Sequence, residues 1–203
     1  MRIVEVGEAA LLVECDDDAE VEAWRVELWR RRDGGELTAV EIVSGARTVL
    51  VDGVPDPAAT ARLMAGWPPP AAAGTTPGPL VEIPVRYDGD DLPWVASHWG
   101  VSIADAVDRI AGVELRVAFG GFAPGFAYLA GLPDAWAVPR LPSPRPRVPA
   151  GAVGLAGPYA GIYPTASPGG WRLVGRTGAV LFDVDRDPPA LLAPGVRVRL
   201  VPA

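Results

Sequence analysis

Arginine, glycine and aromatic residues are concentrated between residues 115 and 182, and these residue types together suit the binding of a small anion. Six arginines stand in this segment against one acid, Asp134, a local balance of +5 in a chain of formal net charge −7. Guanidinium groups bind carboxylates and phosphates through paired N–H donors. The segment therefore predicts a site for a small anion or an acidic partner. The alternative is that each arginine pairs with an acid from elsewhere in the chain.

Glycine and proline supply 22 of the 59 residues from 120 to 178, which excludes long helices and favours tight turns. A linker has a similar glycine and proline content, but this segment also carries many large aromatic residues. Their apolar area is enough to form a core. The segment therefore predicts a folded, turn-rich β structure.

Several kinds of catalytic site are excluded by composition. All 18 basic residues are arginine, so a lysine Schiff base and a Walker A lysine are absent. The single His98 excludes a two-histidine metal motif, and the single Cys15 excludes an internal disulfide and a cysteine-based zinc site. Three carboxylates follow Cys15, so its thiol pKa is predicted to be raised and a catalytic thiol is not expected. No metal site is predicted in this chain.

Composition and charge also argue against some classes of binding partner. The acidic total and the lack of long basic runs argue against nucleic-acid binding. No apolar run reaches the roughly 20 residues that a membrane span needs, and the N-terminal residues carry no apolar signal core. We therefore expect a cytoplasmic protein that binds neither nucleic acid nor membranes.

Residues 1–66 predict an α+β domain with two helices on one face of a sheet. Its expected elements are strands at 2–6, 10–15, 39–43 and 47–51 and helices at 18–32 and 57–66. Acidic residues precede the first helix, and Arg30, Arg31 and Arg32 end it, as the helix dipole favours. We interpret this arginine run as a solvated helix end rather than a nucleic-acid patch.

A proline-rich linker is predicted at residues 67–79, and residues 80–203 predict a mostly antiparallel β-barrel domain. Two short helices are expected, one through His98 and one at 102–110, between strands at 80–87 and 115–120. Further strands are expected at 126–129, 150–156, 160–164, 170–177, 180–183 and 196–201. The segment 141–149 has neither a helix pattern nor a strand pattern. We therefore expect either a stiff clamp that holds Arg145 and Arg147 or an ordinary surface loop.

Three motifs resemble one protein family. They are Gly121-Phe122-Ala123-Pro124-Gly125-Phe126, the segment 148–154 and the segment 163–177, which contains Ser167-Pro168-Gly169-Gly170-Trp171-Arg172. The family contains the B subunit of bacterial 5-oxoprolinase, allophanate hydrolase subunit 1 and the sporulation-kinase inhibitor KipI, and it is similar to subdomains C and D of the carboxyltransferase part of urea carboxylase. The resemblance implies an N-terminal α+β domain followed by a cyclophilin-like β barrel.

The resemblance also implies an activity and a partner. For the 5-oxoprolinase members, the implied reaction is ATP-dependent opening of L-pyroglutamate to L-glutamate. The implied partner is a second subunit similar to carboxyltransferase subdomains A and B. Two alternatives remain open: an allophanate hydrolase or urea carboxylase component, and a KipI-like regulatory module that binds a histidine kinase.

For the 5-oxoprolinase reaction, opening an unstrained lactam needs an activated amide oxygen and groups that hold anions. The candidate catalytic residues are Arg145, Arg147 and Arg176. The candidate binding residues include glycines whose N–H groups could approach an oxyanion, hydroxyl donors and aromatic walls: Gly121, Phe122, Pro124, Gly125, Phe126, Gly151, Tyr163, Ser167, Gly169, Gly170, Trp171 and Arg172.

The general base and the ligands of Mg²⁺ are expected from the second subunit, since Asp134 is the only carboxylate within the segment. This chain alone is therefore expected to be inactive. Family members often carry a histidine shortly before the strand that leads into the first motif, and this chain has Ile110 at about that position.

Overall fold

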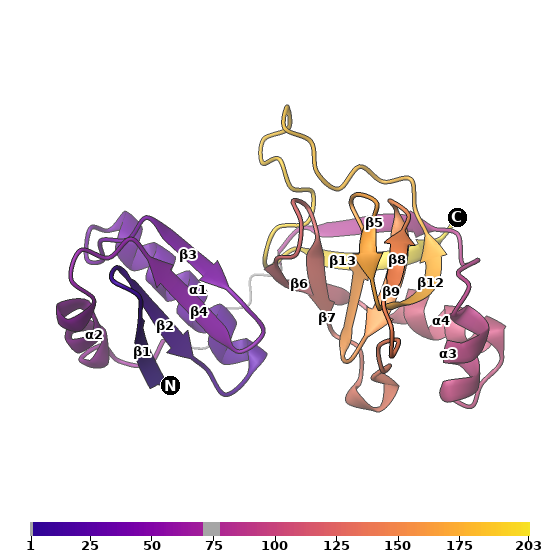
Figure 1. The fold of residues 1–203 in the computed structure, drawn as a ribbon, viewed down its shortest axis with the longest axis horizontal. Coiled ribbons are helices and arrows are strands. Elements are labelled where there is room, and N and C mark those ends of the chain that lie inside the picture. The colour runs from indigo at the N-terminus through magenta and orange to yellow at the C-terminus, as the bar shows by residue number, and fades with distance from the viewer. Residues whose placement is uncertain (1, 71–77) are drawn as a thin grey trace. The chain divides into compact units, whose positions relative to one another are not determined.

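The computed structural model of the chain describes residues 2–70 and 78–203, which form two units that divide between residues 76 and 77 (Figure 1). This division falls inside the predicted linker. The part of that linker at 71–77 lies outside the described residues. Each unit is described by itself below.

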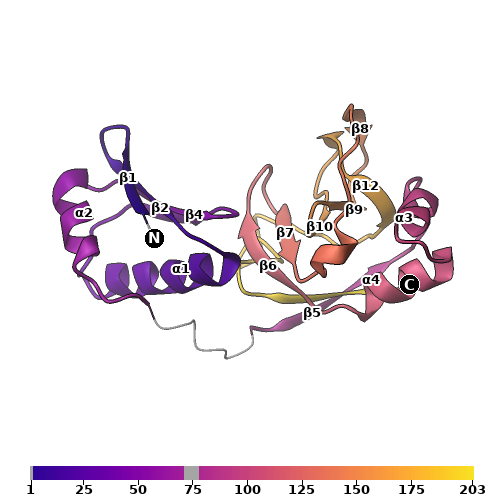
Figure 2. The ribbon, with the colours of Figure 1, turned by 90° about the horizontal axis from the view of Figure 1, so that it is seen from below.

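The first unit is a four-stranded antiparallel sheet with both helices on one face (Figure 2). The strands lie in the order β1-β2-β4-β3, and α1 packs on β3 and β4 while α2 packs on β1 and β2. The elements are β1 (Arg2–Val6), β2 (Ala10–Glu14), α1 (Asp18–Asp33), β3 (Glu41–Ser44), β4 (Thr48–Asp52) and α2 (Pro57–Ala65). The predicted α+β domain is confirmed.

Local chemistry explains where both helices begin. The side chain of Asp17 accepts a hydrogen bond from the backbone N–H of Glu20, and Asp56 caps α2 in the same way through Ala59. These carboxylates satisfy N–H groups that have no partner within the helix. Proline at the first position of α2 already has the backbone angle that a helix needs.

The core of the first unit lies between the sheet and the helices. Val49 and Val51 of β4 alternate with outward-facing residues and meet Trp24 and Leu28 of α1. Arg31 differs from prediction, because it is buried rather than solvated. Its guanidinium lies 4.0 Å above the ring of Trp67, and the side chain forms ion pairs with two glutamates. The last turn of α1 is therefore held by packing as well as by charge.

The second unit is a nearly closed mixed barrel of seven strands with two helices beside it. Its strands lie in the order β12-β9-β10-β7-β6-β13-β5, and all neighbours are antiparallel except β13 and β5. The elements are β5 (Leu80–Val85), α3 (Leu92–His98), α4 (Ile103–Gly112), β6 (Leu115–Gly120), β7 (Ala127–Ala130), the 3₁₀ turn η1 (Asp134–Trp136), β8 (Arg145–Val148), β9 (Ala152–Ala156), β10 (Tyr159–Ile162), β11 (Ser167–Gly169), β12 (Arg172–Arg176) and β13 (Arg197–Pro202).

The barrel nearly closes where its first and last strands meet. Arg86, just beyond β5, and Arg176, at the end of β12, exchange two backbone hydrogen bonds of 2.8 and 2.9 Å. This single bridge joins the two ends of the sheet order. The expected barrel is confirmed, and the closing bridge lies at a residue that the sequence predicts for the site.

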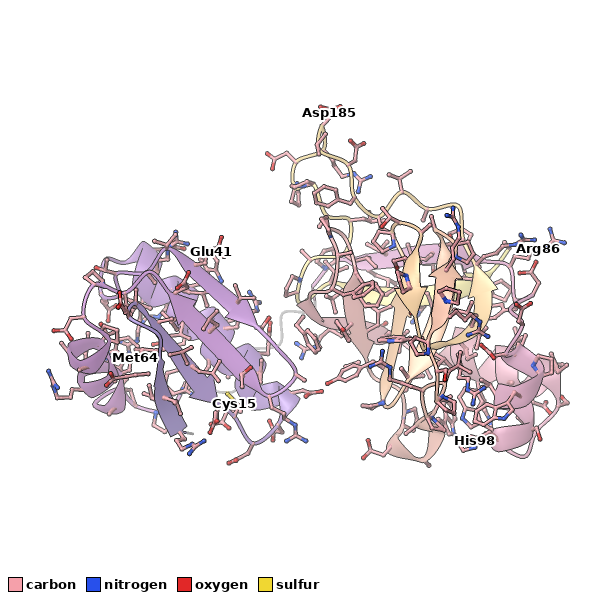
Figure 3. The ribbon with its side chains drawn as sticks, viewed as in Figure 1. Cys15, Glu41, Met64, Arg86, His98 and Asp185 are labelled. Carbon is pink, nitrogen blue, oxygen red and sulfur yellow. The ribbon has the colours of Figure 1, made fainter. Side chains whose placement is uncertain are left out.

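Two segments differ from the sequence-based expectation. The segment 141–149 contains β8, which pairs with β11 in a separate two-stranded ribbon. Each strand of such a ribbon keeps one free edge, so the missing N–H of Pro146 is tolerated there. Residues 180–183 form no strand; Phe182 makes one isolated bridge to Ala190. The chain beyond it forms a projecting loop with Asp185 at its tip (Figure 3).

Replacing Trp24 by alanine should destabilise the first unit and leave the second unchanged. Trp24 is 2% exposed, and removing a buried tryptophan typically costs about 3–5 kcal/mol. Hydrogen exchange measured by mass spectrometry should show lost protection in β1–β4 alone. Val26→Ala, on the same helix at 44% exposure, is the matched control and should change stability by less than about 0.5 kcal/mol. Equal loss of protection in the barrel strands would contradict the separation of the two cores.

Candidate functional site

A cluster of aromatic rings lies on the sheet of β9 and β10 in the second unit. Phe126 is its centre, with ring centroids 5.5 Å from both Tyr163 and Trp171 in edge-to-face contacts. Edge-to-face geometry is favourable for aromatic pairs. These three predicted site residues are therefore brought together. All three are buried, so they support the site rather than line its surface.

Two glycines let these rings approach the backbone of the sheet. Gly154 and Gly161 stand opposite each other in β9 and β10. A Cβ on Gly161 would lie 2.9 Å from Cζ3 of Trp171 and 3.0 Å from Cζ of Phe126. Real Cβ atoms do not approach ring carbons so closely, so the rings occupy the space that any side chain here would fill.

Tyr163 is held against the ribbon of β8 and β11. A Cβ on Gly169 would overlap the Tyr163 hydroxyl oxygen, so the predicted site glycine is needed for this contact. Burial raises the pKa of Tyr163, while the backbone of Trp171 and the nearby Arg140 oppose that change. The hydroxyl therefore remains protonated at neutral pH and can donate a hydrogen bond.

Phe122 is the exposed member of the aromatic group. Its backbone has φ of 68°, in the left-handed region that bulky residues rarely adopt, and its side chain is 61% exposed. The turn that contains Pro124 and Gly125 holds it there, since the N–H of Phe126 donates to the carbonyl of Ala123 at 2.9 Å. The ring lies 6.1 Å from that of Tyr163. Strain of this kind persists only where the surrounding structure holds the residue in place.

The predicted arginine cluster is divided by aspartates that precede α3. Asp91 is buried and accepts hydrogen bonds from Arg145 Nη2 at 2.8 Å and from the backbone N–H of Leu173 at 2.7 Å. Its second oxygen lies 3.6 Å from Arg172 Nη1. Two of the four expected free cations are therefore ion-paired with one carboxylate, which the sequence analysis did not include in the site and which leaves a local balance of one positive charge.

Arg172 is also packed between aromatic and backbone groups. Its guanidinium lies 3.7 Å above the ring of Trp94, which stacks on His98 at 4.9 Å. Its Nε donates to the carbonyl of Pro139 at 3.4 Å. With so many contacts inside the chain, Arg172 is a residue that fixes α3 against β12. Sequence spacing carries no signal for this arrangement, because Asp91 and Arg172 are far apart in the chain.

Arg176 lies apart from the aromatic cluster, at the closing bridge of the barrel. Its Nη2 donates to Asp88 at 2.8 Å, and Asp88 also pairs with Arg86 at 3.1 Å. A groove of about 230 Å³ beside it is lined by Asp88, Gly89, Asp90, Pro149, Ala152, Leu173, Gly175 and Arg176. The carboxylates here correct the expectation that Asp134 is the only acid near the predicted site.

Arg147 differs from the other three arginines. It is exposed on β8 and forms no ion pair with any residue in the described parts of the chain. Because side chains alternate along a strand, Arg145 and Arg147 share one face of the ribbon and Val148 takes the other. Arg147 therefore remains available to an anion from outside the chain.

Ser167 lies on the face of the ribbon that meets the aromatic cluster. It stands opposite Val148, whose buried side chain belongs to that cluster. The Ser167 hydroxyl is buried and has no hydrogen-bond partner among the described residues. An unpaired buried hydroxyl costs free energy, so its presence calls for an explanation.

Not every predicted glycine offers a free N–H group. The N–H of Gly151 donates to the carbonyl of Tyr163 at 2.7 Å, and that of Gly121 donates to the carbonyl of Phe126 at 3.3 Å. A Cβ on Gly151 would overlap the carbonyl oxygen of Thr177. Both N–H groups already have a backbone acceptor, so in this structure neither is a free donor for an oxyanion. Gly170 lies beside Arg140 Nε, a cation that the sequence-based site did not include.

Other reactive groups carry no site in the described parts of the chain. Cys15 is buried, and burial, with a smaller contribution from Glu20, raises the pKa of its thiol to about 11. The predicted direction is confirmed, although burial rather than the neighbouring carboxylates is the main cause. Residues 2–70 and 78–203 contain no group of three or more potential metal ligands. The same residues form no helix long and apolar enough to span a membrane.

Comparison with known proteins gives consistent matches. The family model of the carboxyltransferase domain, subdomain C and D, matches residues 1–192. The B subunit of the Haemophilus influenzae 5-oxoprolinase is 35% identical over 209 residues, which cover 99% of this chain and 97% of that protein. The B subunit of the Escherichia coli O157:H7 5-oxoprolinase is 51% identical over 126 residues, which cover 61% of this chain and 58% of that protein.

A solved structure shares the fold. The crystal structure of TTHA0988 matches with a TM-score of 0.79 and 36% identity, covering 96% of this chain and 40% of that chain. The present chain thus spans less than two thirds of the Escherichia coli relative and of TTHA0988. The match includes both units in the same order along the chain.

Replacing Asp91 by asparagine should destabilise the second unit by about 2–4 kcal/mol, because it removes the charge that Arg145 and Arg172 share in a largely buried setting. Urea unfolding is the suitable measurement, since urea does not screen ion pairs. Asp90→Asn is the matched control: Asp90 is adjacent and exposed, and its replacement should cost less than about 0.5 kcal/mol. Equal effects of the two replacements would show that the Asp91 ion pairs contribute nothing.

Proposed function

Because the chain belongs to the carboxyltransferase domain subdomain C and D family, we propose that it is one subunit of a heteromeric, ATP-dependent 5-oxoprolinase. One observation carries this proposal: the similarity to the B subunit of the Haemophilus influenzae 5-oxoprolinase extends over nearly the full length of both chains. The proposed reaction converts L-pyroglutamate, ATP and water to L-glutamate, ADP and phosphate.

The proposed substrate is a small lactam with one carboxylate. We assign that carboxylate to Arg147, the predicted arginine that has no ion pair in the described parts of the chain. Arg145 and Arg172, both bound to Asp91, fix the ribbon and β12 rather than meeting the substrate. A charge-assisted hydrogen bond from a free guanidinium orients an anion more strongly than a neutral donor does.

The aromatic cluster supplies the second part of the proposed site. Phe122, exposed and held in a strained conformation, covers the edge of the buried rings. An apolar wall of this kind excludes water from a reacting amide and strengthens the electrostatic interactions beside it. The unpaired hydroxyl of Ser167 is proposed to donate to the substrate in the assembled enzyme.

ATP supplies the activation of the amide oxygen, which an unstrained lactam needs before water can open the ring. This chain offers few groups to a ligand: the guanidinium of Arg147 on one face of the ribbon, the hydroxyl of Ser167 on the other, and Arg140, which also has no ion pair among the described residues, beside Gly170. The described residues offer no cluster of carboxylates for Mg²⁺. We therefore propose that a second subunit holds most of the nucleotide and its metal ion and supplies the general base.

The proposal is tested by purifying the chain alone and together with the second subunit, then measuring ADP release that depends on 5-oxoproline. We expect activity only in the assembled enzyme. Arg147→Ala should lower kcat/KM by about 10–100-fold, since hydrogen bonds to charged groups contribute about 1.5–3 kcal/mol. Arg62→Ala, on α2 of the first unit, is the control and should leave activity unchanged.

Two results would contradict this function. Full activity of the Arg147→Ala enzyme would remove that residue from the site. Ammonia release that depends on allophanate, without ADP release that depends on 5-oxoproline, would assign the chain to the alternative amide substrate. An assembled enzyme inactive with both substrates would refute a hydrolase of this class.

Ser167→Ala separates a functional role from a structural one. The Ser167 hydroxyl makes no hydrogen bond in the described parts of the chain, so its loss should leave the free energy of unfolding unchanged or raise it. In the assembled enzyme, we expect kcat/KM to fall by about 2–12-fold, the value of one neutral hydrogen bond. Unchanged kcat/KM would mean that Ser167 is only a buried residue of the ribbon.

A further inference from the structure

The N–H group of Gly170 has no acceptor within the described parts of the chain. Gly170 follows β11 and is buried. Its carbonyl accepts a hydrogen bond from the N–H of Leu141 at 2.8 Å, but its own N–H donates to no described residue. Buried backbone N–H groups without an acceptor are rare in folded proteins. The acceptor that this group needs therefore comes from solution, either as water or as a ligand.

The hydroxyl of Tyr163 is a second donor close to Gly170. It lies against Gly169, where any Cβ would overlap the hydroxyl oxygen. The backbone of Trp171 lowers the pKa of Tyr163, and a backbone group that stabilises a phenolate is an N–H donor. The oxygen of Tyr163 therefore accepts a hydrogen bond from Trp171, and its own proton has no acceptor among the described residues.

Arg140 supplies a cation beside these two donors. Its Nε lies 3.8 Å from the position that a Cβ on Gly170 would occupy, and its side chain forms no ion pair with any described residue. Hydrogen bonds fix the backbone on both sides of it. The carbonyl of Pro139 accepts from Arg172 Nε at 3.4 Å. On the other side, Leu141 donates to the carbonyl of Gly170. Arg140 is therefore held next to Gly170 by its neighbours in the chain.

The surroundings of these donors carry a positive charge. Arg140 and Arg145 both lower the pKa of Tyr163, and no carboxylate is among the groups that shift it. Asp91 pairs with both Arg145 and Arg172, so one positive charge remains in that group as well. An anion placed among the three donors therefore gains from the charges around it and displaces no carboxylate of the chain.

The three donors lie close enough together to bind one anion. Since Gly169 and Gly170 are consecutive, the contact of Tyr163 with Gly169 places its hydroxyl within about 6 Å of the Gly170 nitrogen. The contact of Arg140 with Gly170 places Nε within about 6 Å of the same nitrogen. Donors that meet different oxygens of one carboxylate or phosphate lie about 5–8 Å apart. The separations of the three donors therefore match a single ion of this kind.

We propose that the N–H of Gly170, the hydroxyl of Tyr163 and the guanidinium of Arg140 form a binding site for an oxyanion, which is a carboxylate or a phosphate. The choice of these two anions rests on the proposed function, whose reaction contains both the lactam carboxylate and the phosphoryl group of ATP. The site is separate from Arg147, which lies on the face of the ribbon opposite Ser167. The chain thus offers the two anionic groups of the reaction two different places.

Nuclear magnetic resonance of the full chain tests the proposal, because all three donors belong to this chain. The chain carries isotope-labelled glycine and is titrated with inorganic phosphate in one arm and with L-pyroglutamate in the other. The amide signal of Gly170 is assigned by its loss in Gly170→Ala, whose Cβ would make only ordinary contacts of 3.7 and 3.8 Å. We expect this signal to shift and saturate with at least one of the two anions. Pyrrolidinone, the same lactam ring without a carboxylate, should not shift it.

Variants of the three donors give the size of the effect. Arg140→Ala should weaken anion binding by about 10–100-fold, the value of a hydrogen bond to a charged group. Tyr163→Phe keeps the ring and should weaken binding by about 2–12-fold, the value of one neutral hydrogen bond. Arg62→Ala removes the same charge from α2 and is the matched control. Neither Arg62→Ala nor Arg147→Ala should change the shift of the Gly170 signal.

The two arms identify the source of the anion. A shift with phosphate alone would assign the site to the phosphoryl group, and a shift with L-pyroglutamate would place the substrate carboxylate at Arg140 instead of Arg147. The proposal is overturned if neither anion shifts the Gly170 signal, or if Arg140→Ala binds as tightly as the wild type. An assembled enzyme with 5-oxoproline-dependent ADP release would then keep the proposed function without this site. Binding that depends on Arg140, in an enzyme with no such activity, would keep the site and refute the function.

Discussion

The buried carboxylate of Asp91 is the interaction on which the second unit depends. It joins three segments that no covalent constraint brings together: the start of α3, the ribbon strand β8 through Arg145, and the backbone of β12 at Leu173. Burying a charge costs free energy that a single ion pair does not always recover. Here the carboxylate accepts from a guanidinium and a backbone N–H and lies beside a second guanidinium, which is the condition under which such a group is retained. Its effect is to fix the position of the ribbon.

The position of the ribbon decides which groups remain available. With Arg145 held by Asp91, its neighbour Arg147 projects from the same face without a counterion among the described residues. The opposite face carries Val148 and Ser167 against the aromatic cluster. The cluster in turn lies on Gly154 and Gly161, where any side chain would displace the rings. One ion pair and two glycines therefore determine the placement of a free cation, a buried hydroxyl and an apolar wall.

Features set by neighbouring residues were predictable from the sequence. The caps at Asp17 and Asp56 and the order of helices and strands in the first unit follow from local chemistry, and the structure shows them. The ribbon was not predicted, because β8 contains a proline and its partner β11 has only three residues, so neither has a strand pattern. These two segments form strands because they pair with each other, although the local strand propensity of each is low.

The ion pairs of the candidate site were also not predictable from the sequence, because they join residues that are far apart in the chain. Counting charges between residues 115 and 182 gave an excess of arginine, yet Asp88 and Asp91 come from outside that window and form ion pairs with three of the four arginines singled out. Asp91 and Arg145 are 54 positions apart, so no spacing rule connects them. The strained backbone of Phe122 and the unpaired hydroxyl of Ser167 are likewise properties of three-dimensional packing alone.

Both units carry polar or apolar groups whose partners lie outside the described parts of the chain. In the second unit these are the guanidinium of Arg147 and the hydroxyl of Ser167; in the first they are the exposed side chains of Glu41, Arg47 and Asp52, which form no ion pair among the described residues. Folded chains satisfy buried polar groups and separate like charges where packing allows. The exposed charges are solvated by water, so among these groups only the buried hydroxyl of Ser167 lacks the partner that folding normally supplies.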